Sequence, residues 1–168
     1  FYPGQKDRLI EELQGMTPEK SDKVDAIGAL CPHAGYIYSG DVAGAVYSSM
    51  RPRRTYVILS PNHTGRGRAF AASDEDWSTP LGELSVDEDL LEAVRSRTDL
   101  VSPDAAAHEY EHSIEVQLPF IQMTSPGASI LPVTIKYNGI EQVREVAAAL
   151  ASSITESGRD AVIIARSD

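Results

Sequence analysis

Cysteine and basic residues are scarce in this sequence of 168 residues. The single cysteine, Cys31, excludes a disulfide within the chain and favours a reducing, cytoplasmic compartment. Lysine and arginine number 15 against 25 aspartate and glutamate residues, and the net charge is -10. Nucleic acids and anionic membranes bind clustered basic residues, so neither is expected as a partner. The sequence also lacks an apolar run long enough for a transmembrane helix.

Strand-like and helix-like segments alternate along the chain. Runs of apolar residues predict strands at 24–30, 55–59, 129–135 and 161–165, the first buried on both faces. Apolar spacing and capping signals predict helices at 4–13, 42–49, 87–95, 109–122 and 140–153, with a loop at 74–83 and a turn at 138–139. Within 109–122, Pro119 either kinks the helix or starts a second one. The predicted fold is a three-layer α/β domain with a mostly parallel sheet and helices on both faces.

Polar residues follow three of these strands. His33 comes after strand 24–30, His63 after strand 55–59, and Asp168 after strand 161–165. Ligands of open α/β sheets bind at the carboxyl ends of the strands, so a pocket for a small molecule or a peptide is expected there. Two imidazoles and an anionic ligand are a common set for a divalent metal. The alternative is that the histidines form only local hydrogen bonds and that Asp168 is a frayed terminus without a role.

Residues 108–112, HEYEH, fit the zinc-protease pattern H-E-x-x-H. On a helix, His108, His112 and Glu115 would lie on one face. The opposite face would carry an apolar stripe of Tyr110, Ile114, Leu118 and Ile121. A zinc protease also needs a third ligand, which Glu141 or Glu145 could supply. The pattern is loose in a region rich in His and Glu, so a zinc protease is the least favoured interpretation.

Six short motifs resemble, in their order and spacing, the Memo family, also known as component B of the AmmeMemoRadiSam system. They are Phe1-Tyr2-Pro3; Pro32-His33-Ala34-Gly35-Tyr36 with Tyr38-Ser39-Gly40; Ser60-Pro61-Asn62-His63-Thr64-Gly65; Thr79-Pro80-Leu81-Gly82; Glu111-His112-Ser113-Ile114-Glu115 with Gln117-Leu118-Pro119-Phe120; and Ser167-Asp168. The fifth motif starts at Glu111, so the resemblance places His112 and Glu115 in a recurring element and leaves His108 outside it.

The resemblance implies a fold related to class III extradiol dioxygenases, which bind Fe(II) through two histidines and a carboxylate and use a nearby histidine as acid and base. It implies that His33 and His63 hold the metal, with iron or copper as the expected ion. Asp168 would complete the pocket and orient a neighbouring base, and Asp168, His112 and Glu115 would be the catalytic residues. The family's third ligand is typically a cysteine near its C-terminal end, which Cys31 does not match.

The resemblance therefore implies a single Memo-like domain over residues 1–168 that is incomplete at its C-terminus and at its N-terminus. Arg166 occupies a position at which the family more often has a small residue. With the third ligand missing, weak metal binding and no catalytic turnover are expected of this chain. The parent protein is expected to be a non-haem metal-binding protein. If it is an enzyme, it is expected to be a dioxygenase-like oxidoreductase. The alternative is a peptide- or phosphopeptide-binding module that uses Trp77, Arg66, Arg68 and the basic run 51–54.

Overall fold

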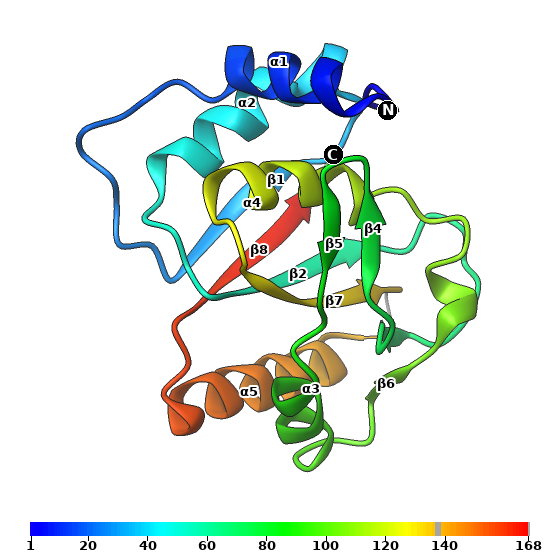
Figure 1. Cartoon of the computed structure of the whole chain (residues 1–168). Coiled ribbons are helices and arrows are strands. Elements are labelled where there is room, and N and C mark those ends of the chain that lie inside the picture. The colour runs from blue at the N-terminus through cyan, green and yellow to red at the C-terminus, as the bar shows by residue number, and fades with distance from the viewer. Residues whose placement is uncertain (137–138, 168) are drawn as a thin grey trace.

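A computed structural model describes residues 1–136 and 139–167, the side chain of Ser167 excepted (Figure 1). Six strands form one sheet in the order β1-β8-β2-β7-β3-β6. They are β1 (Gly28–Pro32), β2 (Thr55–Pro61), β3 (Phe70–Ala72), β6 (Val101–Pro103), β7 (Ser129–Ile135) and β8 (Ala161–Ser167). All neighbours run parallel except β3 and β7, which are antiparallel. The sheet is therefore mixed but mostly parallel, as predicted.

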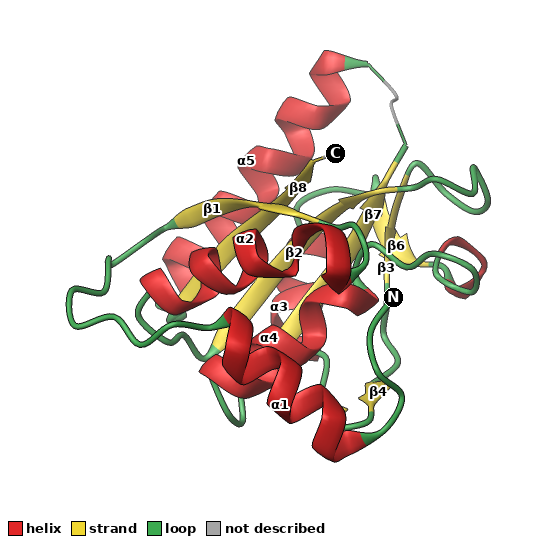
Figure 2. Cartoon of the chain, turned by 90° about the horizontal axis from the view of Figure 1, so that it is seen from above, coloured by secondary structure: helices red, strands yellow, loops and turns green. Residues whose placement is uncertain are grey.

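Helices cover both faces of this sheet (Figures 1 and 2). One face carries α1 (Lys6–Met16), α2 (Tyr36–Ser49) and α4 (Leu118–Thr124), and the other carries α3 (Glu88–Arg95) and α5 (Ile140–Ser157). Side chains of the central strand β2 alternate between the two faces of the sheet, so Tyr56 and Ile58 pack in one core cluster and Val57 packs in the other. The predicted three-layer α/β fold is confirmed.

The helix predicted at 109–122 is wrong over its first half. Residues 109–114 form turns and irregular backbone, a 3₁₀ turn η2 spans Glu115–Gln117, and the α-helix starts only at Leu118. Pro119 lies in the first turn of this helix, where the N–H that a proline lacks would have no partner within the helix. The Glu111 carboxylate also accepts hydrogen bonds from the backbone N–H groups of His112 and Ser113, which competes with helix formation. Tyr110, predicted in the apolar stripe, is exposed, whereas Ile114, Leu118 and Ile121 are buried.

Two further predictions needed correction. The strand predicted at 24–30 lies at 28–32 and is an edge strand of the sheet, with Leu30 exposed and only Cys31 fully buried. The predicted loop 74–83 contains a hairpin of β4 (Trp77–Thr79) and β5 (Gly82–Leu84), which turns at Pro80 and Leu81; Gly82, directly after the turn, has a φ of 128°.

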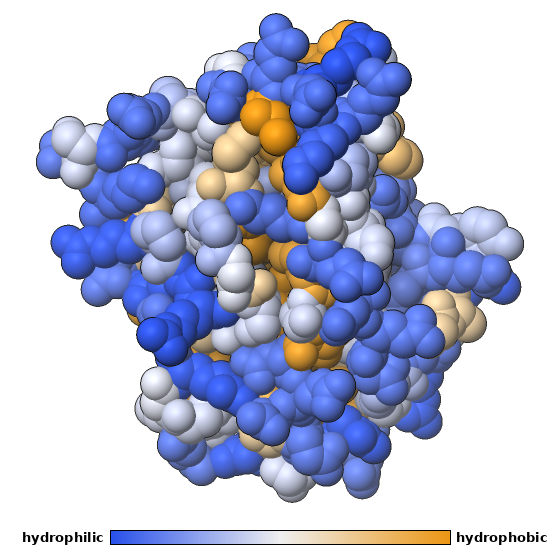
Figure 3. Space-filling model, in the orientation of Figure 1, coloured by the Kyte–Doolittle hydropathy of each residue, from blue (hydrophilic) through white to orange (hydrophobic). Residues whose placement is uncertain are grey.

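The remaining helices follow their sequence signals. Asp87 caps α3 by accepting a hydrogen bond from the Leu90 N–H. Helix α5 is followed directly by Gly158, which caps it in the left-handed conformation with a φ of 62°. The predicted turn at 138–139 includes Asn138, which lies outside the described residues. Within the described residues, no helix is both long and apolar enough to cross a lipid bilayer. Hydrophilic residues dominate the face shown in Figure 3.

Candidate metal centre at the carboxyl edge of the sheet

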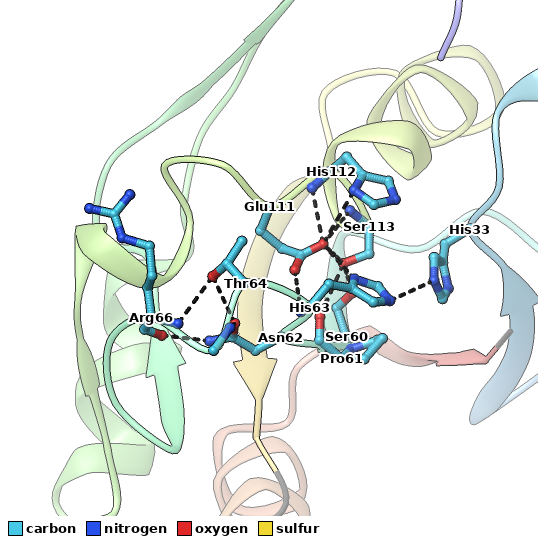
Figure 4. A network of polar contacts seen from close by, with 11 residues as sticks. His33, Ser60, Pro61, Asn62, His63, Thr64, Arg66, Glu111, His112 and Ser113 are labelled. Atoms are coloured by element: carbon cyan, nitrogen blue, oxygen red, sulfur yellow. Dashed lines mark hydrogen bonds and ion pairs between the residues drawn. The ribbon is translucent and has the colours of Figure 1, made fainter.

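Three segments meet at the carboxyl ends of β1 and β2. His33 directly follows β1, and His63 stands two residues beyond β2. The third segment is 111–113, in the turn before η2. Figure 4 shows the side chains of Glu111, His112 and Ser113 facing the two histidine loops. The expectation that His33 and His63 lie close together at this edge is confirmed.

The two imidazoles face each other through their Nε2 atoms. These atoms are 3.3 Å apart, and the ring centroids are separated by 5.0 Å (Figure 4). His33 is buried, whereas 36 % of the His63 side chain is exposed. The pair therefore combines a fixed inner ring with an outer ring that solvent can reach.

Glu111 fixes the orientation of His63. The carboxylate lies 3.0 Å from His63 Nδ1 through Oε1 and accepts the backbone N–H of His63 through Oε2 at 2.7 Å. Oε1 also accepts the N–H groups of His112 and Ser113, each at 3.0 Å, and the Ser113 hydroxyl at 2.7 Å. Ser113 in turn accepts a hydrogen bond from Ser60 of β2 at 2.5 Å. Glu111 thus ties the loop after β2 to the turn at 111–113.

The pKa of Glu111 reflects this network. Burial alone would raise it, but the hydrogen bonds from His63 and Ser113 outweigh burial and lower the pKa to about 2. The carboxylate is therefore ionised near neutral pH and can only accept hydrogen bonds. Consequently His63 carries a proton on Nδ1, which leaves Nε2 of the neutral ring as the nitrogen with a lone pair toward His33.

His112 forms the third imidazole of the cluster. Its ring stacks on Phe1 with centroids 4.4 Å apart and on His63 with centroids 5.3 Å apart. It also lies beside His33, with a centroid distance of 6.1 Å. Metal-ligating atoms of His63, Glu111 and His112 lie within 4.8 Å of one another, a grouping that could hold a metal ion.

Glu115 is held by the amino-terminal segment. The Tyr2 hydroxyl donates a hydrogen bond of 2.8 Å to its Oε1. Burial, and then the Glu115 carboxylate, raise the pKa of Tyr2, so the phenol stays protonated and remains a donor. Phe1 itself accepts the Tyr36 N–H through its carbonyl at 2.9 Å, which anchors the segment to the start of α2.

The other predicted residues near this edge are placed as follows. Asp168 lies outside the described residues. Cys31 is a fully buried thiol in the core, where burial raises its pKa to about 12, so the interpretation as a small core residue is favoured over a metal ligand. Arg166 pairs with Cys31 across β1 and β8 and is itself buried.

His108 is separate from the cluster. It lies edge-on to Trp77 with ring centroids 5.7 Å apart, beside a cavity of about 330 Å³ that also contacts Glu109. Burial lowers its pKa. Among the described residues it belongs to no group of three or more metal-ligating side chains. The expectation that His108 and His112 share a helical face is wrong, because no helix spans 108–112.

Three of the arginines considered for anion binding are engaged with acidic or polar groups. Arg66 pairs with Glu109 at 3.0 Å and stacks over the Tyr110 ring. Arg68 donates to the Ser102 hydroxyl. In the run 51–54, Arg53 contacts the carboxylates of Asp25 and Asp160.

Sequence reasoning missed the central position of Glu111. It belongs to the quoted motif, but a buried carboxylate that orients a ring is not distinguishable by spacing from a solvated one. It also missed Phe1 and Tyr2 as walls of the site. Their contacts with His112 and Glu115 span more than a hundred residues and depend on how α1 and α2 pack.

Comparisons with known proteins place the whole chain in one family. The family model described as "Memo-like protein" matches residues 1–168. A "MEMO1 family protein" of Archaeoglobus fulgidus is 42 % identical over 169 residues, and another of Methanosarcina mazei is 44 % identical over 173 residues. Both alignments cover all of this chain and 63 % of the relative, so the chain spans less than two thirds of their length. The chain belongs to the Memo family.

Proposed function

We propose that this chain carries a centre for a divalent metal ion, held by the Nε2 atoms of His33 and His63. The observation that carries the proposal is their separation of 3.3 Å. Two nitrogen ligands of a tetrahedral ion, each bonded at about 2.0–2.1 Å, lie about 3.3–3.4 Å from each other. The two rings are thus already spaced as ligands of one ion.

The hydrogen bonds of Glu111 support this assignment of ligands. Metal-binding histidines generally donate their second ring N–H to a carboxylate, which fixes the tautomer and raises the basicity of the ligand nitrogen. Glu111 does this for His63 at 3.0 Å. Because Glu111 already accepts four further hydrogen bonds, it serves better as the orienting carboxylate than as a ligand.

His112 and Glu115 take supporting parts in the proposal. The His112 side chain is 30 % exposed and stacks almost parallel to His63, so it can exchange protons with solvent and with a ligand that enters over the pair. Glu115, through Tyr2, holds the amino-terminal segment whose Phe1 ring covers His112. We propose His112 as the acid and base of the site and Glu115 as a positioning residue.

Iron or copper at this position would supply one-electron chemistry toward oxygen or an organic ligand. For the whole family protein we therefore propose a metal-dependent oxidoreductase of the dioxygenase-like kind. A small molecule or a peptide would enter at the carboxyl edge of the sheet. The phosphopeptide alternative is less well supported, because Arg66 and Arg53 are already paired with carboxylates.

Elemental mass spectrometry of dialysed protein tests the proposal after loading with Fe(II) under anaerobic conditions, or with Cu(II). The variants are His33→Ala, His63→Ala and, as a matched control, His108→Ala. We expect the first two to lose most of the bound metal and His108→Ala to retain it. Retention of metal by both site variants would refute the proposal, and loss in the control alone would move the site to the HEYEH segment.

A further inference from the structure

Gln117, at the end of η2, is a polar side chain buried in the core, with 1 % of the residue exposed. It belongs to the motif Gln117-Leu118-Pro119-Phe120, whose three other members are buried apolar residues of α4. A buried amide costs free energy unless its donors and its acceptor find partners, so the partners of Gln117 show which parts of the fold it connects.

The Gln117 amide links α2 to the end of β1. Its Nε2 donates to the Pro32 carbonyl at 3.3 Å, and its Oε1 accepts a hydrogen bond of 2.9 Å from the Tyr47 hydroxyl. A carbonyl can only accept, so the amide nitrogen must face Pro32 and the amide oxygen must face Tyr47. Tyr47 is itself buried, and burial raises the pKa of its phenol, so the hydroxyl stays protonated and donates. Tyr47 therefore orients the amide, and the amide holds the residue directly before His33.

A second hydrogen bond holds the other side of the His33 loop. The hydroxyl of Tyr36, which follows His33 at the start of α2, donates to the Val116 carbonyl at 3.0 Å in a buried contact. Val116 and Gln117 are neighbours in η2. The loop that carries His33 is thus attached to η2 both before and after the histidine.

The segment 111–117 therefore contacts both histidine loops of the centre. At its start, Glu111 binds the ring and the backbone of His63. At its end, Gln117 binds the backbone beside His33. Most residues of the segment are buried, and close packing keeps its two ends at a fixed separation. One segment thus fixes the loops of both imidazoles.

We infer that Gln117, oriented by Tyr47, is a positioning residue for His33 and that, together with Glu111, it sets the distance between the two facing Nε2 atoms. Strand β1 needs such a contact because it is the terminal strand of the described sheet and pairs there with β8 alone. Loss of the amide would release the end of β1 from η2 and let the His33 loop move away from His63. The inference rests on the proposed metal centre, and its test separates the two.

Two variants weaken this contact to different degrees. Gln117→Leu removes the amide at similar volume, and Tyr47→Phe removes only the hydroxyl that orients it. In calorimetric titration with Zn²⁺, we expect Gln117→Leu to lose about tenfold in affinity and Tyr47→Phe about threefold. Tyr47→Phe changes a single hydroxyl group, so it keeps the test independent of how well Gln117→Leu folds.

Tyr56→Phe is the matched control. Tyr56 is as buried as Tyr47, belongs to the same core cluster, and shares a hydrogen bond of 2.6 Å with the Ser125 hydroxyl. It lies near the amino end of β2, away from the histidines. The control should lose as much stability in urea unfolding as Tyr47→Phe, but it should bind Zn²⁺ within about twofold of wild type.

A measurement without metal separates the positioning role from the centre itself. Long-range ¹H–¹⁵N NMR of ¹⁵N-histidine-labelled protein in EDTA should show changed ring signals of His33 in Gln117→Leu and in Tyr47→Phe. The ring signals of His108 should stay unchanged in both variants, and those of His33 should stay unchanged in Tyr56→Phe.

The outcomes distinguish the two proposals. Zn²⁺ binding that is normal in wild type and unaffected in Gln117→Leu and Tyr47→Phe would overturn the positioning role and leave the centre intact. An equal loss of affinity in Tyr47→Phe and Tyr56→Phe would also overturn it, because a general loss of stability would explain both. Wild-type protein that binds no Zn²⁺ would refute the centre. In that case, unchanged His33 signals in EDTA would overturn the positioning role as well, and changed signals would support it.

Discussion

Glu111 holds His63 at two points, the ring Nδ1 at 3.0 Å and the backbone N–H at 2.7 Å. One buried carboxylate thus sets both the position of the loop after β2 and the ring nitrogen that faces His33. Glu111→Gln would replace a strong acceptor by a weaker one that also carries donors. We expect the affinity for Zn²⁺ to fall by about 10–100-fold, as measured by calorimetric titration. Glu109→Gln, at a neighbouring exposed carboxylate, should leave it unchanged; an equal loss in both variants would contradict the orienting role.

The low pKa of Glu111 also predicts how stability depends on pH. An ordinary carboxyl titrates near 4.5, whereas Glu111 in the folded chain titrates near 2. The folded state therefore binds fewer protons than the unfolded state between these values. The stabilisation is complete above about pH 5 and disappears as the pH falls toward 2.

Urea unfolding in EDTA measures this effect. The difference in free energy of unfolding between wild type and Glu111→Gln should be largest near pH 6. It should shrink by about 2–3 kcal/mol by pH 2.5. A difference that stays constant over this range would show that Glu111 is not preferentially ionised in the folded state.

The contact between α1 and α2 depends on a glycine. A Cβ at Gly44 would lie 2.0 Å from the backbone oxygen of Met16, which cannot move without displacing α1. Gly44→Ala should therefore destabilise the chain by about 1–3 kcal/mol in urea unfolding. Gly15→Ala is the matched control, because nothing lies within 4 Å of its Cβ position and it lies within α1. That variant should instead be stabilised by up to about 1 kcal/mol. Effects of the same sign in both variants would contradict the close packing.

Features set by residues close together in the sequence were predictable, and features set by contacts between distant segments were not. The strand at 55–59 and its following His63 were predictable, because a central parallel strand is apolar throughout and the polar residue after it must lie at the sheet edge. The helix at 109–122 was not, since a buried carboxylate and Pro119 outweigh the local periodicity. The exposure of Leu30 could not be predicted either, because it depends on which strands neighbour β1.

Arg166 predicts a substitution that stabilises the chain. Its guanidinium is buried and donates through Nε to the Cys31 carbonyl, while Nη1 and Nη2 have no hydrogen-bond partner among the described residues. Burial lowers the pKa of this arginine to about 10. Replacing an uncompensated buried charge by an apolar residue of similar length is often neutral or favourable.

Arg166→Met should consequently leave the free energy of unfolding unchanged or raise it by about 1 kcal/mol. Arg144→Met, at an exposed arginine on α5 that pairs with Glu141, should change it by less than about 0.5 kcal/mol. A loss of more than about 2 kcal/mol in Arg166→Met would contradict this expectation and show that the guanidinium contributes net stability.

The metal centre is tested most directly by following the histidine ring nitrogens themselves. Long-range ¹H–¹⁵N NMR of ¹⁵N-histidine-labelled protein, titrated with Zn²⁺ as a diamagnetic probe, reports the state of each nitrogen. We predict that Nε2 of His33 and of His63 both shift to values typical of a ligated nitrogen. His63 keeps its proton on Nδ1, and His108 does not change. Ligation through Nδ1 of His63, or shifts confined to His108 and His112, would contradict it.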